Sequence, residues 1–419
     1  MPRVPPEQST SRVEGGSVLA AAVVSGVAGY GVLLLTARML SAESNAQFLV
    51  FWGALFSIFG VLIGITTETT RAVLVAGPDA AGPAVVPHTT MLGLGLVVVT
   101  GLSGPWWAPR LFESEWRLLL AALLVGTALF VVHAGIAGAV GGRRMWGAYS
   151  TLVGVEAATR LVLVVVATML ATGLVGFAWA AAVSAGAWVL LALASPRLRG
   201  AWHTRVAVGR RGLSLRVGAS CVAAGASALL LVGYPVLLKA TTSDAVFDGA
   251  APILLAVSLS RAPLLVPLGA YQNVAVAKVV RHGIRALVPV WTALAVVCAV
   301  GSGAAWLVGP WLLRLINADY HVSGPVFAAL VVAAGLVALL TLTGAATVAV
   351  DAHAVYLGGW IGATVVSLVV LTLPGTLEHR VLASLFAGPV VGVLLHLGLA
   401  WSRLARSTAP HPAPSRGHA

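Results

Sequence analysis

The chain has 419 residues, of which 59% are hydrophobic and only 9% are charged. About 25% of the residues of a typical soluble domain are charged, so this composition excludes a water-soluble globular fold. The formal net charge is +12, but the basic residues gather in short loops between apolar runs, as orientation signals do, and no nucleic-acid-binding motif accompanies them. We therefore expect a membrane protein without a nucleic acid partner.

The apolar residues form runs that are long enough to cross a bilayer as helices. In chain order these runs cover 17–39, 46–67, 85–104, 116–137, 151–170, 173–194, 214–238, 246–271, 286–308, 324–346, 352–373 and 379–401. The sequence therefore predicts an all-α, polytopic membrane protein of about twelve transmembrane helices. They form two pseudo-symmetric six-helix bundles, 17–194 and 214–401, which a basic cytoplasmic connector at 195–213 separates. Segments 1–16 and 402–419 are predicted to be disordered cytoplasmic tails.

The distribution of Lys and Arg residues predicts the orientation. If the N-terminus is cytoplasmic, most of the 25 basic residues fall on the cytoplasmic side, including all the arginines between 197 and 216. An even number of spans then returns the C-terminus to the same side. We expect a multi-pass protein of the cytoplasmic (inner) membrane, with both the N-terminus and the C-terminus in the cytoplasm.

Motifs of known catalytic chemistry are absent from the sequence. It has no G-x-x-x-x-G-K-[ST] nucleotide loop, no H-E-x-x-H zinc helix and no G-x-S-x-G nucleophile elbow. The ten histidines lack a second ligand at metal spacing. We therefore expect a protein that is not an enzyme and that uses no cofactor and no metal. A membrane-embedded glycan polymerase or ligase stays open as an alternative function.

Charged residues inside predicted spans are candidates for function, because a charge in hydrocarbon is costly. Glu156 and Arg160 lie four residues apart on one face of a predicted helix and can form an ion pair, which is either a gating or a structural pair. Arg261 lies near the middle of the span 246–271 and has no acid within one helical turn. Its guanidinium group suits phosphate oxygens well.

Three further cations lie near the ends of predicted spans. Arg38 and Lys239 are at outer ends, and Arg71 is at an inner end beside Glu68. Snorkelling, or a local pair with Glu68, would explain each of them singly. If these cations share a cavity with Arg261, its field attracts anions. We expect Arg261, Arg38 and Arg71 to contact such a substrate, with Lys239 as a secondary candidate.

The first span continues into the stretch TARMLSAESNAQF. This stretch resembles the opening of Wzx-type flippases for polysaccharide biosynthesis, in the MOP exporter superfamily, which follows the pattern A-R-x-L-[ST]-x-E-x-[FY]-G-x-[FY]. The matching residues are Ala37, Arg38, Leu40, Ser41, Glu43 and Phe48, while Ala46 or Gln47 replaces the usual glycine. Thr67 or Thr69 before Arg71, the SRAPL around Arg261 and the six-plus-six layout are similar to that family as well.

Two departures from the family pattern concern ion coupling. The seventh span has Tyr234 and Pro235 where such proteins often carry an acidic residue. The first span lacks the acid expected of a proton- or sodium-coupled multidrug relative. The second departure argues against the drug-exporter branch, and the first puts a cation-coupling site in doubt.

The resemblance implies a transporter that moves a polyprenyl-diphosphate-linked oligosaccharide, a precursor of cell-surface polysaccharide, across the cytoplasmic membrane by alternating access. Its implied partners are this lipid-linked anionic glycan and membrane lipids, with a glycan polymerase or glycosyltransferases as further candidates. In this interpretation Arg261, Arg38 and Arg71 contact the diphosphate, and Glu156 and Arg160 form the gating or structural pair. A small-molecule or drug exporter of the same fold is the remaining alternative.

Overall fold

The computed structural model describes residues 12–77 and 80–406. Across these residues the chain is helical, and its β structure is limited to one isolated bridge between Ala84 and Arg205. The predicted all-α fold class is therefore confirmed. The chain forms two compact units, Met1–Ala240 and Thr241–Ala419, which we call the N-terminal and C-terminal units.

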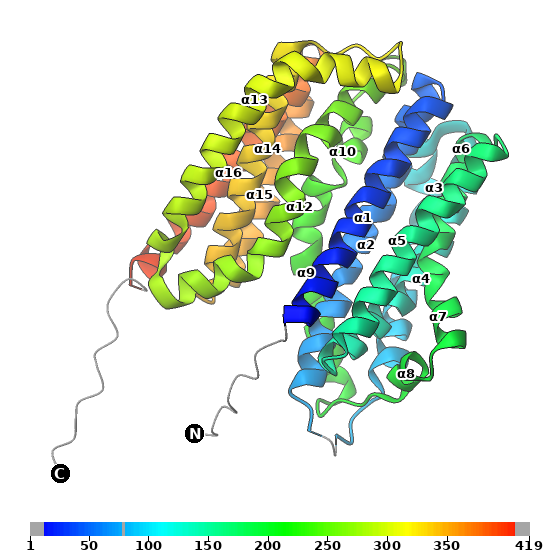
Figure 1. Cartoon of the computed structure of the whole chain (residues 1–419), viewed down its shortest axis with the longest axis vertical. Helices are drawn as coiled ribbons and strands as arrows, with labels where there is room; N and C mark the ends of the chain where they lie inside the picture. Colours follow the sequence, from blue (N-terminus) through cyan, green and yellow to red (C-terminus); the bar gives the residue numbers. More distant parts are fainter. Residues whose placement is uncertain (1–11, 78–79, 407–419) are drawn as a thin grey trace. The chain divides into compact units, whose positions relative to one another are not determined.

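The N-terminal unit contains long helices joined by short turns (Figure 1). They are α1 (Arg12–Met39), α2 (Ala42–Leu74), α3 (Val85–Phe112), η1 (Glu113–Glu115), α4 (Trp116–Gly142), α5 (Trp146–Met169), α6 (Gly173–Val183), η2 (Ser184–Ala187), α7 (Trp188–Ala194), α8 (Pro196–Arg199), η3 (Gly200–His203), α9 (Arg210–Leu231) and α10 (Tyr234–Ala240). Helix α1 begins within the segment 1–16, and the rest of that predicted tail, 1–11, lies outside the described residues.

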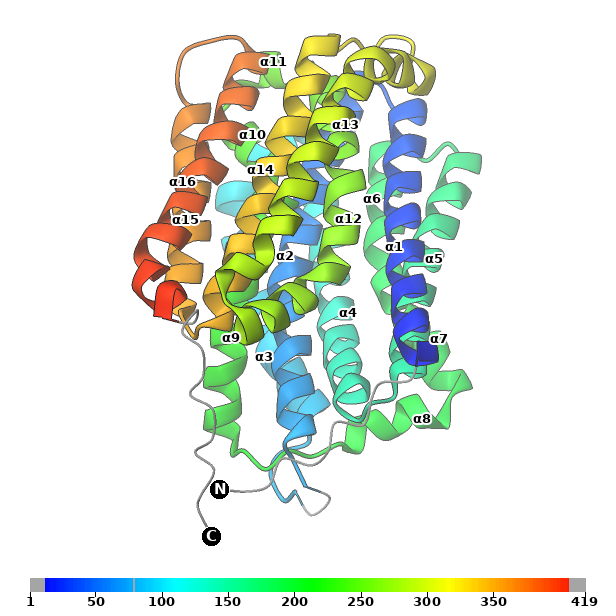
Figure 2. The same ribbon diagram turned by 60° about the vertical axis from the view of Figure 1, so that its left-hand side comes forward.

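The C-terminal unit is a bundle in which α14 packs against α12, α13 and α16, and α15 packs against α16 (Figure 2). Its elements are α11 (Asp244–Phe247), α12 (Ala251–His282), η4 (Ile284–Leu287), α13 (Val288–Ile316), α14 (Gly324–Ala349), α15 (His353–Leu371) and α16 (Leu377–Arg406). Helix α16 extends into the predicted tail 402–419, of which residues 407–419 lie outside the described part of the chain.

The described residues contain ten segments that are long and apolar enough to cross a membrane. One of them, Val85–Gly142, consists of two helices, α3 and α4, which turn back on each other at η1. Helix α12 contributes the shorter apolar segment Ala251–Leu265. The chain is thus a multi-pass membrane protein, as its hydropathy predicts.

Helix α2 holds the N-terminal unit together through close approaches to α4 and α9. The hydroxyl groups of Thr66 and Thr70 donate to the carbonyl oxygens of Ala134 and Gly138 on α4, at 3.1 and 3.3 Å. On the α9 side, a Cβ atom built at Gly64 would lie 2.4 Å from the backbone nitrogen of Cys221. Small residues allow this proximity, and in a bilayer close packing and interhelical hydrogen bonds drive helix association.

The seventh predicted span, 214–238, packs within the N-terminal unit. The sequence places the division at the connector 195–213, whereas the two compact units divide after Ala240. Helices α9 and α10 both contact α2, which explains why they cluster with the N-terminal helices. The span is also broken into two helices at Val232 and Gly233, next to Pro235, whose ring cannot donate a backbone hydrogen bond.

One end of the N-terminal unit gathers the segments that were predicted to lie on one side of the membrane. The amide of Val85 donates to the carbonyl oxygen of Thr204 at 2.8 Å, and Arg205 Nη1 donates to the carbonyl oxygen of Gly82 at 3.0 Å. The connector thus crosses beside the α2–α3 turn and the end of α4 (Figure 2). We call this the connector end; the Lys and Arg distribution predicts that it is cytoplasmic.

The close approach of α2 and α9 generates a prediction for stability. We expect Gly64→Leu to lower the melting temperature of the purified protein, since overpacking costs roughly 1–3 kcal/mol and here the new side chain meets backbone. Circular dichroism in detergent measures this effect. Gly154→Leu is the matched control, because a Cβ atom at Gly154 meets nothing within 4 Å. Equal melting temperatures for the two variants would contradict the packing argument.

Candidate functional site: charges inside the spanning helices

Glu156 and Arg160 form a salt bridge along one face of α5. Both residues are only 5% exposed. The hydroxyl of Ser184 also donates to Glu156 Oε1, at 3.3 Å. Ser184 belongs to η2, a 3₁₀ segment that interrupts the helical run between α6 and α7, and such mid-helix interruptions often mark functional positions. The pair is therefore enclosed by protein and tied to a second element.

Aromatic rings of α2 cover the Arg160 guanidinium group. Its Cζ atom lies 4.7 Å from the ring centre of Phe56 and 5.8 Å from that of Trp52. Both distances are within the range of cation–π attraction, which strengthens when the cation is shielded from water. The rings and the carboxylate together replace the hydration that Arg160 loses inside the membrane.

His133 on α4 is a third ionisable group in this region. Its ring stacks on Phe130 with the ring centres 5.1 Å apart, and Glu156 and Arg160 are close enough to act on it electrostatically. Two buried nitrogen atoms here, His133 Nδ1 and Arg160 Nε, have no hydrogen-bond partner among the described residues. The structure thus places His133 within electrostatic reach of the Glu156–Arg160 pair.

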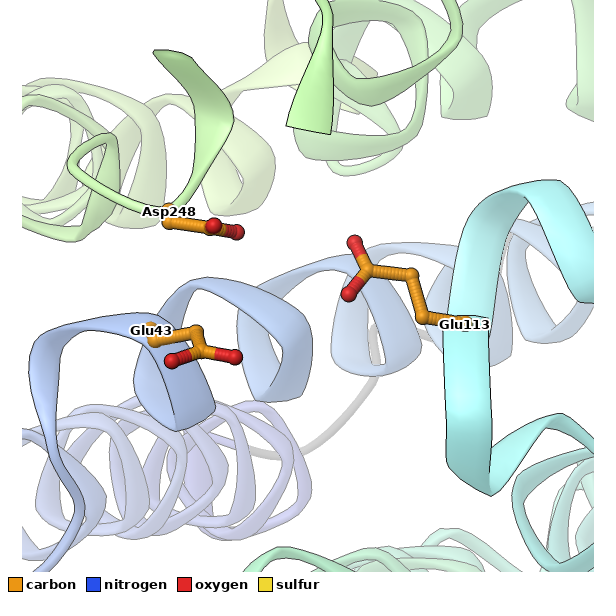
Figure 3. Close-up of side chains that lie close together, drawn as sticks. All are labelled: Glu43, Glu113 and Asp248. Carbon is orange, nitrogen blue, oxygen red and sulfur yellow. The ribbon is translucent and has the colours of Figure 1, made fainter. Parts of the chain in front are cut away.

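The buried Lys239 forms a second pair, with the partly buried Glu113. Glu113 comes directly after α3, and its other carboxylate oxygen accepts a hydrogen bond from Gln47 Nε2 at 2.7 Å. Figure 3 shows Glu113 and Glu43, both of the N-terminal unit, with their carboxylates directed into the same space; oxygens of these two groups lie within 4.8 Å of each other. Lys239, whose side chain is 1% exposed, does not snorkel to the interface but neutralises Glu113.

Glu113 adopts an unusual backbone conformation to make these contacts. Its φ angle is +51°, in the left-handed region where a non-glycine residue costs of order 1 kcal/mol or more. The turn directs one side chain towards both α2 and α10, and its two polar contacts offset the cost. Because Glu113 and Lys239 are 126 residues apart, no local pattern in the sequence predicts their pairing.

Arg71 and Arg38 lie far from each other within the N-terminal unit. Arg71 binds Glu68 through two hydrogen bonds, at 2.7 and 2.5 Å, and its side chain is 48% exposed. Arg38 is exposed near the C-terminal end of α1, where α2 begins. A helix rises about 1.5 Å per residue, so most of the length of α2 separates the two arginines. The structure does not bring them to one site.

Arg261 is the predicted site residue of the C-terminal unit. It lies in α12 between Ser260 and Ala262 and is 7% exposed. The five acids of this unit, by sequence, are Asp244, Asp248, Asp319, Asp351 and Glu378. In the described part of the chain, two of these acids lie in the first turn of a helix, Asp244 in α11 and Glu378 in α16. The other three lie in turns between helices. The central part of this helical bundle thus carries a cation and no carboxylate of its own.

Curated mycobacterial proteins match the chain over almost its whole length, although no protein-family model matches it. The uncharacterized protein Rv3630 of Mycobacterium tuberculosis is 40% identical over 403 residues, covering 93% of this chain and 93% of the relative. The uncharacterized protein Mb3654 of Mycobacterium bovis matches with the same identity and coverage. The uncharacterized protein Rv1510 of M. tuberculosis is 40% identical over 398 residues, covering 93% and 90% of the two chains.

Solved structures of MOP superfamily transporters share the fold. An inward-facing multidrug resistance MATE family transporter has a TM-score of 0.70 at 15% identity, with 94% of this chain and 98% of that chain covered. The outward-facing conformation of such a transporter gives 0.65 at 16% identity, with 94% and 95% covered. A MOP superfamily transporter from Pyrococcus furiosus gives 0.62 at 15% identity, with 95% and 96% covered.

These structural matches show the fold, and the sequence matches show the family. The chain has the MATE-like fold of the MOP superfamily, and it belongs to the family of the mycobacterial proteins Rv3630, Mb3654 and Rv1510.

Proposed function

We propose that this protein is a transporter that moves a polyprenyl-diphosphate-linked oligosaccharide across the cytoplasmic membrane by alternating access. The observation that carries the proposal is the electrostatics of the C-terminal unit, where Arg261 is buried in α12 and the acids lie in turns and first turns of the described helices. A cationic interior favours an anionic substrate. It disfavours the cationic compounds that a drug exporter would carry.

The N-terminal unit contributes less positive charge than its sequence suggests. Arg71, Arg160 and Lys239 are each paired with a carboxylate, so three of the basic residues are neutralised within that unit. Arg261 is our main candidate for the diphosphate contact, because it is buried in α12 and the forked donors of arginine match phosphate oxygens. Arg38, near the end of α1, is the second candidate.

The structural neighbours support the transport mechanism. They include inward-facing and outward-facing conformations of multidrug resistance MATE family transporters, so this fold is compatible with two access states. For the P. furiosus transporter, a reverse polarity of the binding pocket is said to suggest a different function. Pocket polarity thus varies among proteins of this fold, and a change from cationic to anionic cargo fits that variation.

One prediction of this proposal concerns Arg261. In proteoliposomes that contain a fluorescent polyprenyl-diphosphate oligosaccharide, we expect Arg261→Gln to slow the movement of substrate between leaflets about tenfold or more, since a charged hydrogen bond contributes about 1.5–3 kcal/mol. A membrane-impermeant quencher reports the leaflet. Arg314→Gln removes an exposed arginine of α13 and serves as the matched control, with the wild-type rate expected.

Three results would overturn the proposal. The first is that the Arg261→Gln and Arg38→Ala variants both move the lipid-linked substrate at the wild-type rate at equal protein density. The wild-type protein could extrude organic cations and leave the lipid-linked glycan in place, which would indicate a drug exporter. It could also join or extend glycans in detergent, which would indicate a polymerase or ligase.

A second prediction assigns a structural role to the pair of Glu156 and Arg160. Glu156→Gln leaves a buried guanidinium group without its countercharge, so we expect a loss of stability of about 3–5 kcal/mol and a lower melting temperature in detergent. The double variant Glu156→Gln/Arg160→Met removes both charges and should recover most of the stability and the transport rate. Recovered stability with transport still abolished would instead show that the pair gates the transporter.

A further inference from the structure

We propose that a pocket at the connector end of the N-terminal unit binds the phosphate headgroup of an anionic membrane phospholipid. The pocket lies among the end of α2, the end of α4 and the connector, and it has a volume of about 740 Å³. Cavities of this size hold ordinary small ligands. It belongs entirely to the N-terminal unit and is separate from the charged residues discussed above.

Basic side chains dominate the polar lining of this pocket. Arg143 and Arg144 at the end of α4 line it, together with His203 and Arg205 of the connector, and no described lining residue is acidic. Arg143 and Arg144 take part in no salt bridge among the described residues. Like charges around one hollow repel each other, so an anion bound among them would lower the energy of the arrangement.

The local backbone positions these arginines. Helix α4 ends at Gly142, and Arg144 takes a left-handed φ angle of +58°, so the two consecutive arginines do not continue the helix. A Cβ atom built at Gly200 would lie 3.6 Å from Arg143 Nη1, which places that guanidinium group against the connector. Thr204 also lines the pocket, and its buried hydroxyl has no hydrogen-bond partner among the described residues.

Apolar and aromatic residues nearby indicate that the pocket lies at the membrane surface. Leu74 lines it and is 45% exposed, and the neighbouring Val75 is 66% exposed. Trp188 and Trp202 pack with ring centres 6.2 Å apart beside the connector, and tryptophan is enriched at the level of lipid headgroups. An exposed apolar edge beside a cationic hollow matches a phospholipid, which presents an acyl chain next to a phosphate.

A lipid headgroup accounts for these features better than a soluble anion does. Basic pockets between spanning helices on the cytoplasmic side bind anionic headgroups, and the Lys and Arg distribution predicts that this end is cytoplasmic. Inorganic phosphate would use the arginines but would gain nothing from Leu74 and Val75. The binding test can therefore separate the two sources of phosphate.

The test is a titration of the detergent-solubilised full chain with a fluorescent short-chain phosphatidylglycerol, at about 0.15 M salt, where diffuse surface attraction is screened. We expect Arg143→Gln/Arg144→Gln to weaken binding roughly tenfold or more, since each basic contact contributes about 1 kcal/mol. Arg197→Gln/Arg211→Gln removes the same charge from exposed positions that do not line the pocket, and it should change binding less than about twofold. Phosphatidylcholine should not compete.

A second variant keeps the proposal testable if the double variant does not fold. Ala76→Glu adds a carboxylate to the lining without removing an arginine, and it should weaken binding as well. Equal losses in the pocket variant and the Arg197/Arg211 control would show diffuse charge attraction only and overturn the proposal. Unchanged binding in both pocket variants, or full displacement of the lipid by millimolar inorganic phosphate, would also overturn it.

Discussion

The tight packing of α2 against α4 and α9 is the constraint on which the N-terminal unit depends. Lipid tails are as apolar as leucine, so helices in a bilayer gain little from hiding apolar side chains. The glycines and threonines along α2 and α4 supply close contact and hydrogen bonds instead. Gly64 extends the same packing to α9, which is why a helix after the connector belongs to the first unit.

Helix α2 also organises the charges of this unit. Gln47 near its start contacts Glu113, Phe56 in its middle covers Arg160, and Glu68 near its end binds Arg71. Each of these contacts provides a charged group with a partner, and at the buried Arg160 an unpaired charge would be costly. Three cations of the N-terminal unit, Arg71, Arg160 and Lys239, are therefore paired with carboxylates.

The C-terminal unit has a different electrostatic character. Its acids stand in turns and first turns of the described helices, and Arg261 is buried in α12. This difference is the basis of the proposed recognition of an anion through the C-terminal unit. The basic pocket at the connector end is a second cationic feature, in which Arg143 and Arg144 stand on the turn after α4.

The sequence by itself determined the features that a single helix controls. Run length predicted the spans, and helical spacing predicted that Glu156 and Arg160, or Glu68 and Arg71, could pair. Only the tertiary structure decided which helices meet: the pairing of Glu113 with Lys239, the inclusion of α9 in the N-terminal unit, the separation of Arg38 from Arg71, and the pocket at the connector end. Hydropathy does not predict these contacts between helices, because a helix that faces lipid and a helix that faces protein are equally apolar. The register between two helices depends instead on a few small and polar residues.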